Sequence, residues 1–310
     1  MRDSQEWSSI LEDYLEGLEF PAEPGSLYGP RSYSLECGGK RIRPLLTMMA
    51  CGVFSEGLQP ALPCAAAVEV FHNFTLLHDD IMDNASVRRG RPAVHRRWGE
   101  NSAILSGDAM MIYSYILLEQ AGAKLLPRIL SVFNDTSLKV CEGQQYDMDF
   151  ENLENVTPDD YLKMITLKTA VLMAGAAKIG AICGGATEVD CGKLYDFGME
   201  LGLAFQIRDD ILDSYGSTDS LGKNTGGDII EGKKTYLSIA AMRKADEETR
   251  ARFSGILHNK DMIPDRKIAE VISIYEKLGV RAQAEEAVSH YTSRAIAALD
   301  AISAPQGCLW

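Results

Sequence analysis

Two short clusters of aspartate are the residues best suited to chemistry in this sequence. Asp79 and Asp83 are four residues apart, so on a helix their carboxylates share one face and repel each other unless a cation lies between them. Asp209 and Asp213 repeat this spacing, again at the end of an apolar run. Carboxylate oxygens suit Mg²⁺, which keeps further positions for water and phosphate oxygens. We therefore predict that the two clusters face each other across a Mg²⁺ site.

Basic residues are concentrated at a few places in a chain that is acidic overall. The 31 basic and 44 acidic residues give a formal net charge of −13, which argues against a general nucleic-acid footprint. The bases cluster in Lys40–Arg43, in Arg88–Arg91, and around Lys223 and Lys233-Lys234. Lys168 lies in an apolar run, where its ammonium needs a partner or a path to water. With Mg²⁺ opposite them, such Arg and Lys side chains are what a diphosphate needs.

Composition and cysteine content limit the class of protein. No uncharged stretch exceeds the twelve residues of Pro44–Ser55 or Gly57–Val68, whereas a membrane span needs roughly 18. Met1–Phe20 carries several acids and no apolar core, so we expect no signal peptide. The seven cysteines are scattered and form no C-x-x-C pair, which indicates reduced thiols. We expect a cytoplasmic protein with no membrane span and no nucleic-acid partner.

The hydrophobic pattern has a helical period almost throughout the chain. Thr157 followed by Pro158 and two acids is a typical helix start, and alternating runs with hairpin turns are nearly absent. The sequence therefore predicts an all-α fold with a single domain over residues 1–310. The expected helices are Trp7–Phe20, Arg43–Gly52, Ala61–Asp83, Ala103–Ala121, Leu126–Tyr146, Asp159–Ile182, Cys191–Asp213 and one or two within Arg266–Leu299.

Two segments interrupt the helical pattern. Phe20–Pro30 is rich in proline and glycine and predicts a loop. Ser214–Gly232 contains five glycines and several acids, so we do not expect a regular helix there. A long loop inside a compact domain is more often functional than idle. Ser214–Gly232 is therefore either a lid over the site or a simple surface connection.

Several motifs follow one another from about Gly38 to Lys234, which is most of the chain. They are Gly38-Gly39-Lys40-x-x-Arg43-Pro44, His78-Asp79-Asp80-x-x-Asp83 with Arg88-Arg89-Gly90, Lys168-Thr169, Gln206-x-x-Asp209-Asp210-x-x-Asp213, Gly222-Lys223 and Gly226-Gly227-Asp228. Together they resemble the trans-type isoprenyl diphosphate synthases, or polyprenyl synthetases. The resemblance implies an all-α bundle around a central apolar cavity, normally a homodimer. Such enzymes use Mg²⁺ to condense isopentenyl diphosphate with an allylic diphosphate, head to tail.

The resemblance also implies roles for individual residues. Asp79 and Asp83 would bind two Mg²⁺ ions on the allylic diphosphate, and Asp209, supported by Asp210 and Asp213, would bind a third. The residues implied to contact the allylic diphosphate are Arg88, Lys168, Thr169, Gln206, Lys223 and Lys233. Of these, the catalytic ones would be Lys168, Thr169, Gln206 and Arg88. Isopentenyl diphosphate would be bound by Lys40, Arg43, His72 and Arg89.

The length of the product should depend on the side chains below the first aspartate cluster. Phe74 and Thr75 precede Asp79 by five and four residues, and Phe71 lies one turn further back. In the family, a bulky residue at the position of Phe74 is typical of farnesyl or geranylgeranyl synthases, so these three residues are the expected chain-length floor. The alternative for Phe71 and Phe74 is that they are plain core residues. Small residues at Ala174–Ala177 and Gly184-Gly185 either let helices approach closely or leave room for a prenyl chain.

Three other functions are compatible with parts of the pattern. A terpene cyclase usually replaces the second aspartate cluster and does not need Lys40 and Arg43, which this chain keeps. A metal-dependent phosphohydrolase is suggested by His72, His78 and His95, but it leaves the second cluster unexplained. A non-catalytic partner subunit should have lost one aspartate cluster, and this chain has kept both.

Overall fold

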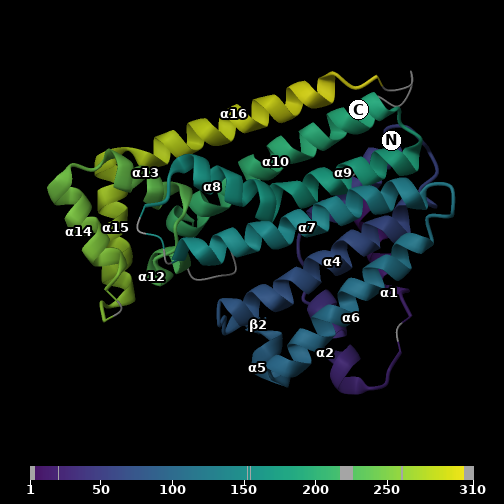
Figure 1. Cartoon of the computed structure of the whole chain (residues 1–310), viewed down its shortest axis with the longest axis horizontal. Coiled ribbons are helices and arrows are strands. Elements are labelled where there is room, and N and C mark those ends of the chain that lie inside the picture. Colours follow the sequence, from purple (N-terminus) through teal and green to yellow (C-terminus); the bar gives the residue numbers. More distant parts are fainter. Residues whose placement is uncertain are drawn as a thin grey trace. The chain divides into compact units, whose positions relative to one another are not determined.

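The computed structural model describes residues 4–19, 21–151, 153, 155–216, 226–259 and 261–303 (Figure 1). These residues form two compact units, which are described separately. Unit 1 comprises Met1–Asp135, Met173–Tyr195 and Ala301–Trp310, and unit 2 comprises Thr136–Leu172 and Asp196–Asp300. The prediction of an all-α fold is confirmed, and the expected single domain over residues 1–310 stays a prediction.

Unit 1 is built around helix α4 (Ala61–Met82), which packs along α6 (Glu100–Glu119). The small residues Ala65–Ala67 at the start of α4 are fully buried, and the helix is mostly apolar as far as Leu77, with Glu69 and Asn73 as buried polar exceptions. Burial of this helix therefore fixes the position of Asp79 and Asp80 at its C-terminal end. The neighbouring helices are α1 (Ser4–Glu16), α2 (Gly25–Glu36), α3 (Ile42–Gly52) and α5 (Val94–Trp98).

Helix α9 (Val171–Gly184) approaches α3 very closely within unit 1. A Cβ atom on Gly180 would lie 2.1 Å from the main-chain oxygen of Thr47, and one on Gly184 would lie 2.6 Å from that of Cys51. The hydroxyl of Thr47 donates to the main-chain oxygen of Ala176 at 3.0 Å. Of the two explanations for the small residues, the structure therefore favours close helix packing at this place.

Unit 2 has its own hydrophobic core, formed by residues such as Tyr161, Ile207, Phe253 and Tyr275. Its first helix, α8, begins as predicted at Thr157, whose hydroxyl accepts from the main-chain N–H of Asp160 in a capping box. The helices of this unit are α8 (Pro158–Ile165), the π-helical segment η1 (Thr166–Ala170), α12 (Gly227–Glu231), α13 (Tyr236–Lys244), α14 (Glu247–Leu257), α15 (Pro264–Leu278) and α16 (Val280–Asp300). Helices α7 (Leu126–Glu151), α9 and α10 (Glu188–Tyr215) contribute residues to both units.

The structure corrects one prediction and adds an element that the pattern did not show. The expected loop Phe20–Pro30 is wrong from Gly25 onward, because α2 includes both Gly25 and Pro30. Helix α2 packs against α6, and its burial at Pro30, Tyr33 and Ser34 outweighs the poor helix propensity. The only strands in the described residues are Val87–Arg88 (β1) and Arg91–Pro92 (β2), which form one antiparallel pair.

One helical run of the chain is strongly apolar. Pro158–Gly184, with 27 residues, is long and apolar enough to cross a membrane by length and composition alone. In the structure 78% of its most apolar stretch is buried. A core helix of a soluble protein has these same properties, and the run forms part of the cores described above.

Candidate active site

The first aspartate motif lies at the C-terminal end of α4, and its three aspartates differ in environment. Asp80 is buried with 2% of its surface exposed, whereas Asp79 and Asp83 are partly exposed. The short β1–β2 hairpin brings Arg88 back to this helix end, where its Nε donates to Asp80 at 2.7 Å and its Nη2 to Asp79 at 3.3 Å. Asp80 thus anchors Arg88, and Asp79 and Asp83 remain the pair suited to a cation.

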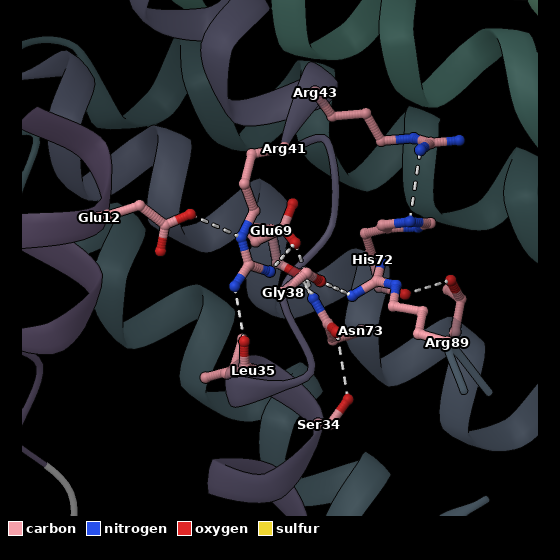
Figure 2. A network of polar contacts seen from close by, with 11 residues as sticks. Glu12, Ser34, Leu35, Gly38, Arg41, Arg43, Glu69, His72, Asn73 and Arg89 are labelled. Atoms are coloured by element: carbon pink, nitrogen blue, oxygen red, sulfur yellow. Dashed lines mark hydrogen bonds and ion pairs between the residues drawn. The ribbon is translucent and has the colours of Figure 1, made fainter. Parts of the chain in front are cut away.

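Three of the residues expected to bind isopentenyl diphosphate, Arg43, His72 and Arg89, lie close together in unit 1 (Figure 2). Arg43 at the start of α3 and His72 on α4 lie 3.3 Å apart between Nη1 and Nε2. Arg89 of the hairpin donates to the main-chain oxygen of Gly38. Lys40 is exposed in the same loop. Unit 1 therefore brings Arg43, His72 and Arg89 into one cationic cluster beside the first aspartate motif.

Burial and the neighbouring cations determine the charge of His72. Burial lowers its pKa well below the usual value, and the positive charges of Arg43 and Arg89 lower it further. The imidazole is therefore neutral, and its Nε2 accepts from Arg43. Burial also lowers the pKa of Arg89. A site in which these positive charges lie close together is suited to an anion such as a diphosphate.

Glycine is required at one position of the loop that carries Lys40. Gly39 has φ of +136°, a conformation that other residues rarely adopt. A Cβ atom on Gly39 would lie 2.9 Å from the guanidinium carbon of Arg89. The predicted Gly38-Gly39 motif thus allows the loop to pass directly beside the Arg89 side chain.

The second aspartate motif lies near the end of α10, in unit 2, and follows the pattern of the first. Asp210 is buried and accepts from the hydroxyl of Tyr161 at 2.5 Å and from the main-chain N–H of Tyr236 at 2.9 Å. Burial raises the pKa of Asp210 to about 6. Asp209 is exposed and Asp213 is partly exposed. In both motifs the middle aspartate is buried and hydrogen-bonded, and the outer two are partly or fully exposed.

Asp228 joins this motif from the following segment. Its main-chain N–H donates to Oδ2 of Asp213 at 3.1 Å, and the N–H of Gly226 donates to the main-chain oxygen of Asp213 at 2.7 Å. Burial and the charge of Asp213 raise the pKa of Asp228 to about 7. A bound cation would favour the ionised forms of both carboxylates. The sequence places Asp228 in a glycine-rich motif and predicts no role for this residue.

Lys168 lies in the π-helical segment η1, and its partner is Asp147 of α7. The two side chains are about one quarter exposed, and Nζ donates to Oδ2 of Asp147 at 2.6 Å. A Cβ atom on Gly143 would lie 2.2 Å from the main-chain nitrogen of Lys168, so α7 packs directly on η1. Single π-helical turns are frequent at functional sites. The ammonium of Lys168 needs a partner in its apolar surroundings, and the carboxylate of Asp147 on α7 is that partner.

A chain of hydrogen bonds connects η1 to the second aspartate motif within unit 2. The hydroxyl of Thr169 donates to Oε1 of Gln206 at 2.8 Å. Nε2 of Gln206 donates to Oδ1 of Asp210 at 3.2 Å. The structure thus brings Thr169 and Gln206 together and fixes the orientation of the Gln206 amide relative to Asp210.

The remaining predicted cations lie after α12 or outside the described residues. Lys233 forms an ion pair with Glu231 at 3.3 Å and is about one third exposed. Lys223, and with it residues 217–225 of the predicted lid Ser214–Gly232, lie outside the described residues. Within the described part of that segment, α10 continues to Tyr215 and Gly227–Glu231 forms α12, so the segment is not loop throughout.

The expected chain-length floor consists of stacked aromatic rings on α4. Phe74 lies edge to face on Phe71 at a centroid distance of 5.4 Å and on His78 at 4.9 Å. Phe71 in turn packs on Phe133 at 5.2 Å. Thr75 is partly exposed and donates to the main-chain oxygen of His72 at 2.8 Å. Phe71 is fully buried and Phe74 is 8% exposed, so Phe74 is the outer ring of this stack.

Oxygen donors at the two motifs fit Mg²⁺ better than a soft metal. Asp79 with Asp83, and Asp209 with Asp213, offer only carboxylates, and each pair includes partly or fully exposed members. Among the described residues, no group of three or more His, Cys, Asp or Glu side chains could hold a metal ion by protein ligands alone. Mg²⁺ commonly takes one or two carboxylates and completes its shell with water and substrate phosphate. The donor sets therefore fit an ion shared with a phosphorylated ligand.

Several residues of the site could not be selected from the sequence. Asp147 and Tyr161 stand among many similar residues, and only their contacts with Lys168 and Asp210 identify them. Glu69 is a buried acid on α4 that pairs with Arg41 at 2.6 Å. The sequence does contain one signal for Glu69. It is an acid within a mostly apolar helix, and a charge in such a place needs a buried partner.

Comparison with known proteins gives consistent results. The polyprenyl synthetase family model matches residues 24–276. A short chain isoprenyl diphosphate synthase of Methanothermobacter thermautotrophicus is 39% identical over 276 residues, which are 89% of this chain and 84% of that protein. The crystal structure of a geranylgeranyl pyrophosphate synthase has a TM-score of 0.94 and 39% identity, covering 99% of this chain and 95% of that one. The geranylgeranyl pyrophosphate synthase of Corynebacterium glutamicum, complexed with isoprenyl diphosphate and magnesium, has a TM-score of 0.88 and 26% identity, covering 99% and 96%.

Proposed function

Because this chain belongs to the polyprenyl synthetase family, we propose that it condenses isopentenyl diphosphate with an allylic diphosphate, head to tail, and releases pyrophosphate. It is a trans-isoprenyl diphosphate synthase, a prenyltransferase that makes short-chain prenyl diphosphates. The match of residues 24–276 to the family carries this conclusion. The aspartate motifs and the cationic cluster described above supply the chemistry that the reaction needs.

Isopentenyl diphosphate is bound in this proposal by Lys40, Arg43, His72 and Arg89. The neutral His72 offers a polar contact without adding charge, and Arg43 and Arg89 supply bidentate donors. The allylic diphosphate is bound by Arg88, Lys168, Thr169, Gln206, Lys223 and Lys233. Because hydrogen bonds to Thr169 and Asp210 fix the amide of Gln206, its second N–H can donate to the diphosphate at little entropic cost.

Asp79, Asp83, Asp209 and Asp213 would hold Mg²⁺ on the allylic diphosphate, with three ions expected in all. Bound Mg²⁺ would act as a Lewis acid that stabilises the negative charge developing on the leaving pyrophosphate. Asp80 and Asp210 do not take part directly. They hold Arg88 and Gln206 in place, so that these donors are oriented before the substrate binds.

The protein side chains then favour the ionisation of the allylic C–O bond. Arg88 and Lys168 supply positive charge to the departing oxygen, while Arg43, His72 and Arg89 keep the second substrate close, so that its alkene attacks as the carbocation forms. The departing pyrophosphate is the base that takes the final proton. Water must be excluded during this step, since it would quench the cation.

The hydrolase and cyclase alternatives are not favoured by the geometry or by the family. A hydrolase metal site would need imidazole nitrogens, yet Nε2 of His72 contacts Arg43 and Nε2 of His78 lies 3.0 Å from the main-chain oxygen of Ile104. Both aspartate motifs are present, as a synthase requires. We propose farnesyl or geranylgeranyl diphosphate as the product, with Phe71, Phe74 and Thr75 as the floor, and the cytoplasm as the location.

We also propose a homodimer, because one face of α6 is apolar and exposed. The outward residues of this face are Ile104, Leu105, Met111, Ile112 and Ile116, each at least 38% exposed. A helix that is apolar on all sides is normally covered by protein on all of them, so exposed apolar residues on such a helix mark an interaction surface. A second copy of the chain, seated on the same face, would cover it symmetrically.

Product analysis tests the proposed function. The protein would be incubated with isopentenyl diphosphate and labelled dimethylallyl, geranyl or farnesyl diphosphate, with and without Mg²⁺, and the products identified by mass spectrometry. We expect elongated prenyl diphosphates only when Mg²⁺ is present. Release of phosphate without any longer prenyl product would contradict the proposal and favour a hydrolase.

A further inference from the structure

A buried ion pair lies behind the loop that carries Lys40 and Arg43. Arg41, 8% exposed, donates through Nη1 to Oε1 of Glu69, 2% exposed, at 2.6 Å. Its Nη2 donates to the main-chain oxygen of Leu35 at 2.6 Å, and its Nε to Glu12 of α1 at 3.2 Å. The side chains of Arg41 and Arg43 leave the loop in different directions (Figure 2). Arg41 is thus hydrogen-bonded to α1, α2 and α4.

A second layer of hydrogen bonds holds Glu69 itself. Nδ2 of the fully buried Asn73 donates to Oε1 of Glu69 at 2.9 Å, and the hydroxyl of Ser34 donates to Oδ1 of Asn73 at 3.1 Å. The carboxylate therefore has a fixed orientation before Arg41 reaches it. The buried polar groups of this network are paired with one another. Such a network contributes mainly by specifying a single conformation, and less by adding stability.

The loop held by this network has an unfavourable backbone. Gly38, Gly39 and Arg41 all have positive φ, of 67°, 136° and 47°. An arginine in the left-handed region persists only where its surroundings hold it there. Arg41 is also the residue before the first turn of α3, and its side chain does not cap that helix. The contacts of the Arg41 guanidinium with Glu69, Leu35 and Glu12 are available to hold this strained conformation, and the one with Glu69 is the most buried.

From these contacts we propose that Glu69 and Arg41 are positioning residues for the isopentenyl diphosphate site. They hold Gly38–Arg43 so that Lys40 and Arg43 converge on one diphosphate, and they do not touch the substrate themselves. Glu69 also places a negative charge behind a group of mutually repelling cations, which include Arg41 and Arg89. This proposal rests on the proposed function.

The substitution Glu69→Gln tests the proposal, since it keeps the shape and removes the charge. We expect the KM for isopentenyl diphosphate, and its Kd in calorimetry without allylic substrate, to rise about tenfold. The KM for farnesyl diphosphate should change by less than about twofold, because the allylic ligands are elsewhere. A merely structural role would instead lower the active fraction, and so kcat, with both KM values unchanged.

Two further variants show whether Glu69 acts through Arg41. In an Arg41→Met background, Glu69→Gln should cause no additional rise in the KM for isopentenyl diphosphate. Glu12→Gln removes a half-exposed partner of Arg41 and should raise the Kd about twofold without a folding defect. Should Glu69→Gln fail to fold, Glu12→Gln decides the question, and an unchanged Kd there overturns the proposal.

Asp190→Asn is the matched control. Asp190 is another buried acid of unit 1, 3% exposed, and it is bonded to Thr187 and Lys193 at the start of α10. This variant should lose stability but keep both KM values. If the wild-type protein makes no prenyl product, the proposed function fails; if it makes product and Glu69→Gln leaves the Kd for isopentenyl diphosphate unchanged, only the inference about Glu69 fails.

Discussion

At the scale of single residues, the site depends on charged groups whose partners lie on other elements. Lys168 is such a case, because its ammonium is neutralised by Asp147, which is 21 residues earlier in the chain. A lysine that binds a diphosphate as a point charge must be oriented by a partner and must still be able to leave that partner. In the proposed function, the carboxylate of Asp147 would orient the Lys168 ammonium before the substrate binds.

We predict different outcomes for the two partners. Lys168→Met should lower kcat/KM for the allylic diphosphate by about 100-fold, since a charge that stabilises the leaving group is lost. Asp147→Asn should lower it by only about tenfold, because the lysine is kept but is less well oriented. Steady-state kinetics with saturating isopentenyl diphosphate measures both values. The control is Asp149→Asn, an exposed acid on the same helix, and an equal loss in that variant would contradict the assignment.

His72 leads to a prediction about pH and stability. Its pKa in the folded protein is well below its value in the unfolded chain, about 6.5, so below that pH the unfolded state binds the additional proton. The folded state therefore loses stability as the pH falls through 6.5, by up to about 1.4 kcal/mol per pH unit. His72→Gln should remove this slope between pH 7.5 and 5.5 in denaturant titrations. The two proteins share all other titratable groups, so equal slopes would contradict the prediction.

At the scale of elements, the packing of α7 on η1 sets the position of Lys168. We predict that Gly143→Ala will destabilise the protein by roughly 1–3 kcal/mol and reduce activity, because the added Cβ would overlap the main chain at Lys168. Gly192→Ala on α10 is the control, since nothing lies within 4 Å of its Cβ. That variant should gain roughly 0.4–1 kcal/mol. Thermal unfolding and specific activity measure both effects, and equal behaviour of the two variants would exclude a close approach at Gly143.

The aromatic stack on α4 gives a prediction about product length. Phe74→Ala removes the outermost ring of the Phe71–Phe74 stack, so the prenyl chain should grow past it and the products should become longer. Mass spectrometry of the products formed from farnesyl diphosphate measures the shift. Val53→Ala, a buried residue at the end of α3, is a control for the loss of core volume alone. An unchanged product distribution in Phe74→Ala would refute the role of Phe74 as the floor.

Elements that local periodicity determines can be predicted from the sequence, whereas elements that depend on tertiary burial cannot. The helices around both aspartate motifs follow from local periodicity, and Thr157 caps α8 as its local pattern indicates. Helix α2 could not be predicted, since its proline and glycine disfavour a helix, whereas its burial against α4, α5 and α6 favours one. The π-helical turn at Lys168 likewise has no signature in residue type.

At the scale of the whole molecule, the sequence identifies the types of chemical group but not their pairing. The spacing of Asp79 and Asp83 predicts a cation site, yet it does not show that Asp80 is buried against Arg88. The same holds for Asp210 and Tyr161. Burial and long-range contacts separate the anchoring aspartates from the exposed ones, and neither can be read from the order of residues. The proposed roles of both aspartate pairs stay predictions.

The exposed apolar face of α6 gives the last prediction, on assembly. Ile112→Glu places a charge in the middle of this face, where 59% of the residue is now exposed, so a symmetric interface would bring two like charges together. We expect light scattering to show a dimer for the wild type and a monomer for the variant. Val189→Glu, at an exposed apolar position on α10, should stay dimeric. Since dimers of this kind need a continuous apolar surface, an Ile112→Glu variant that remains dimeric would place the interface on another face.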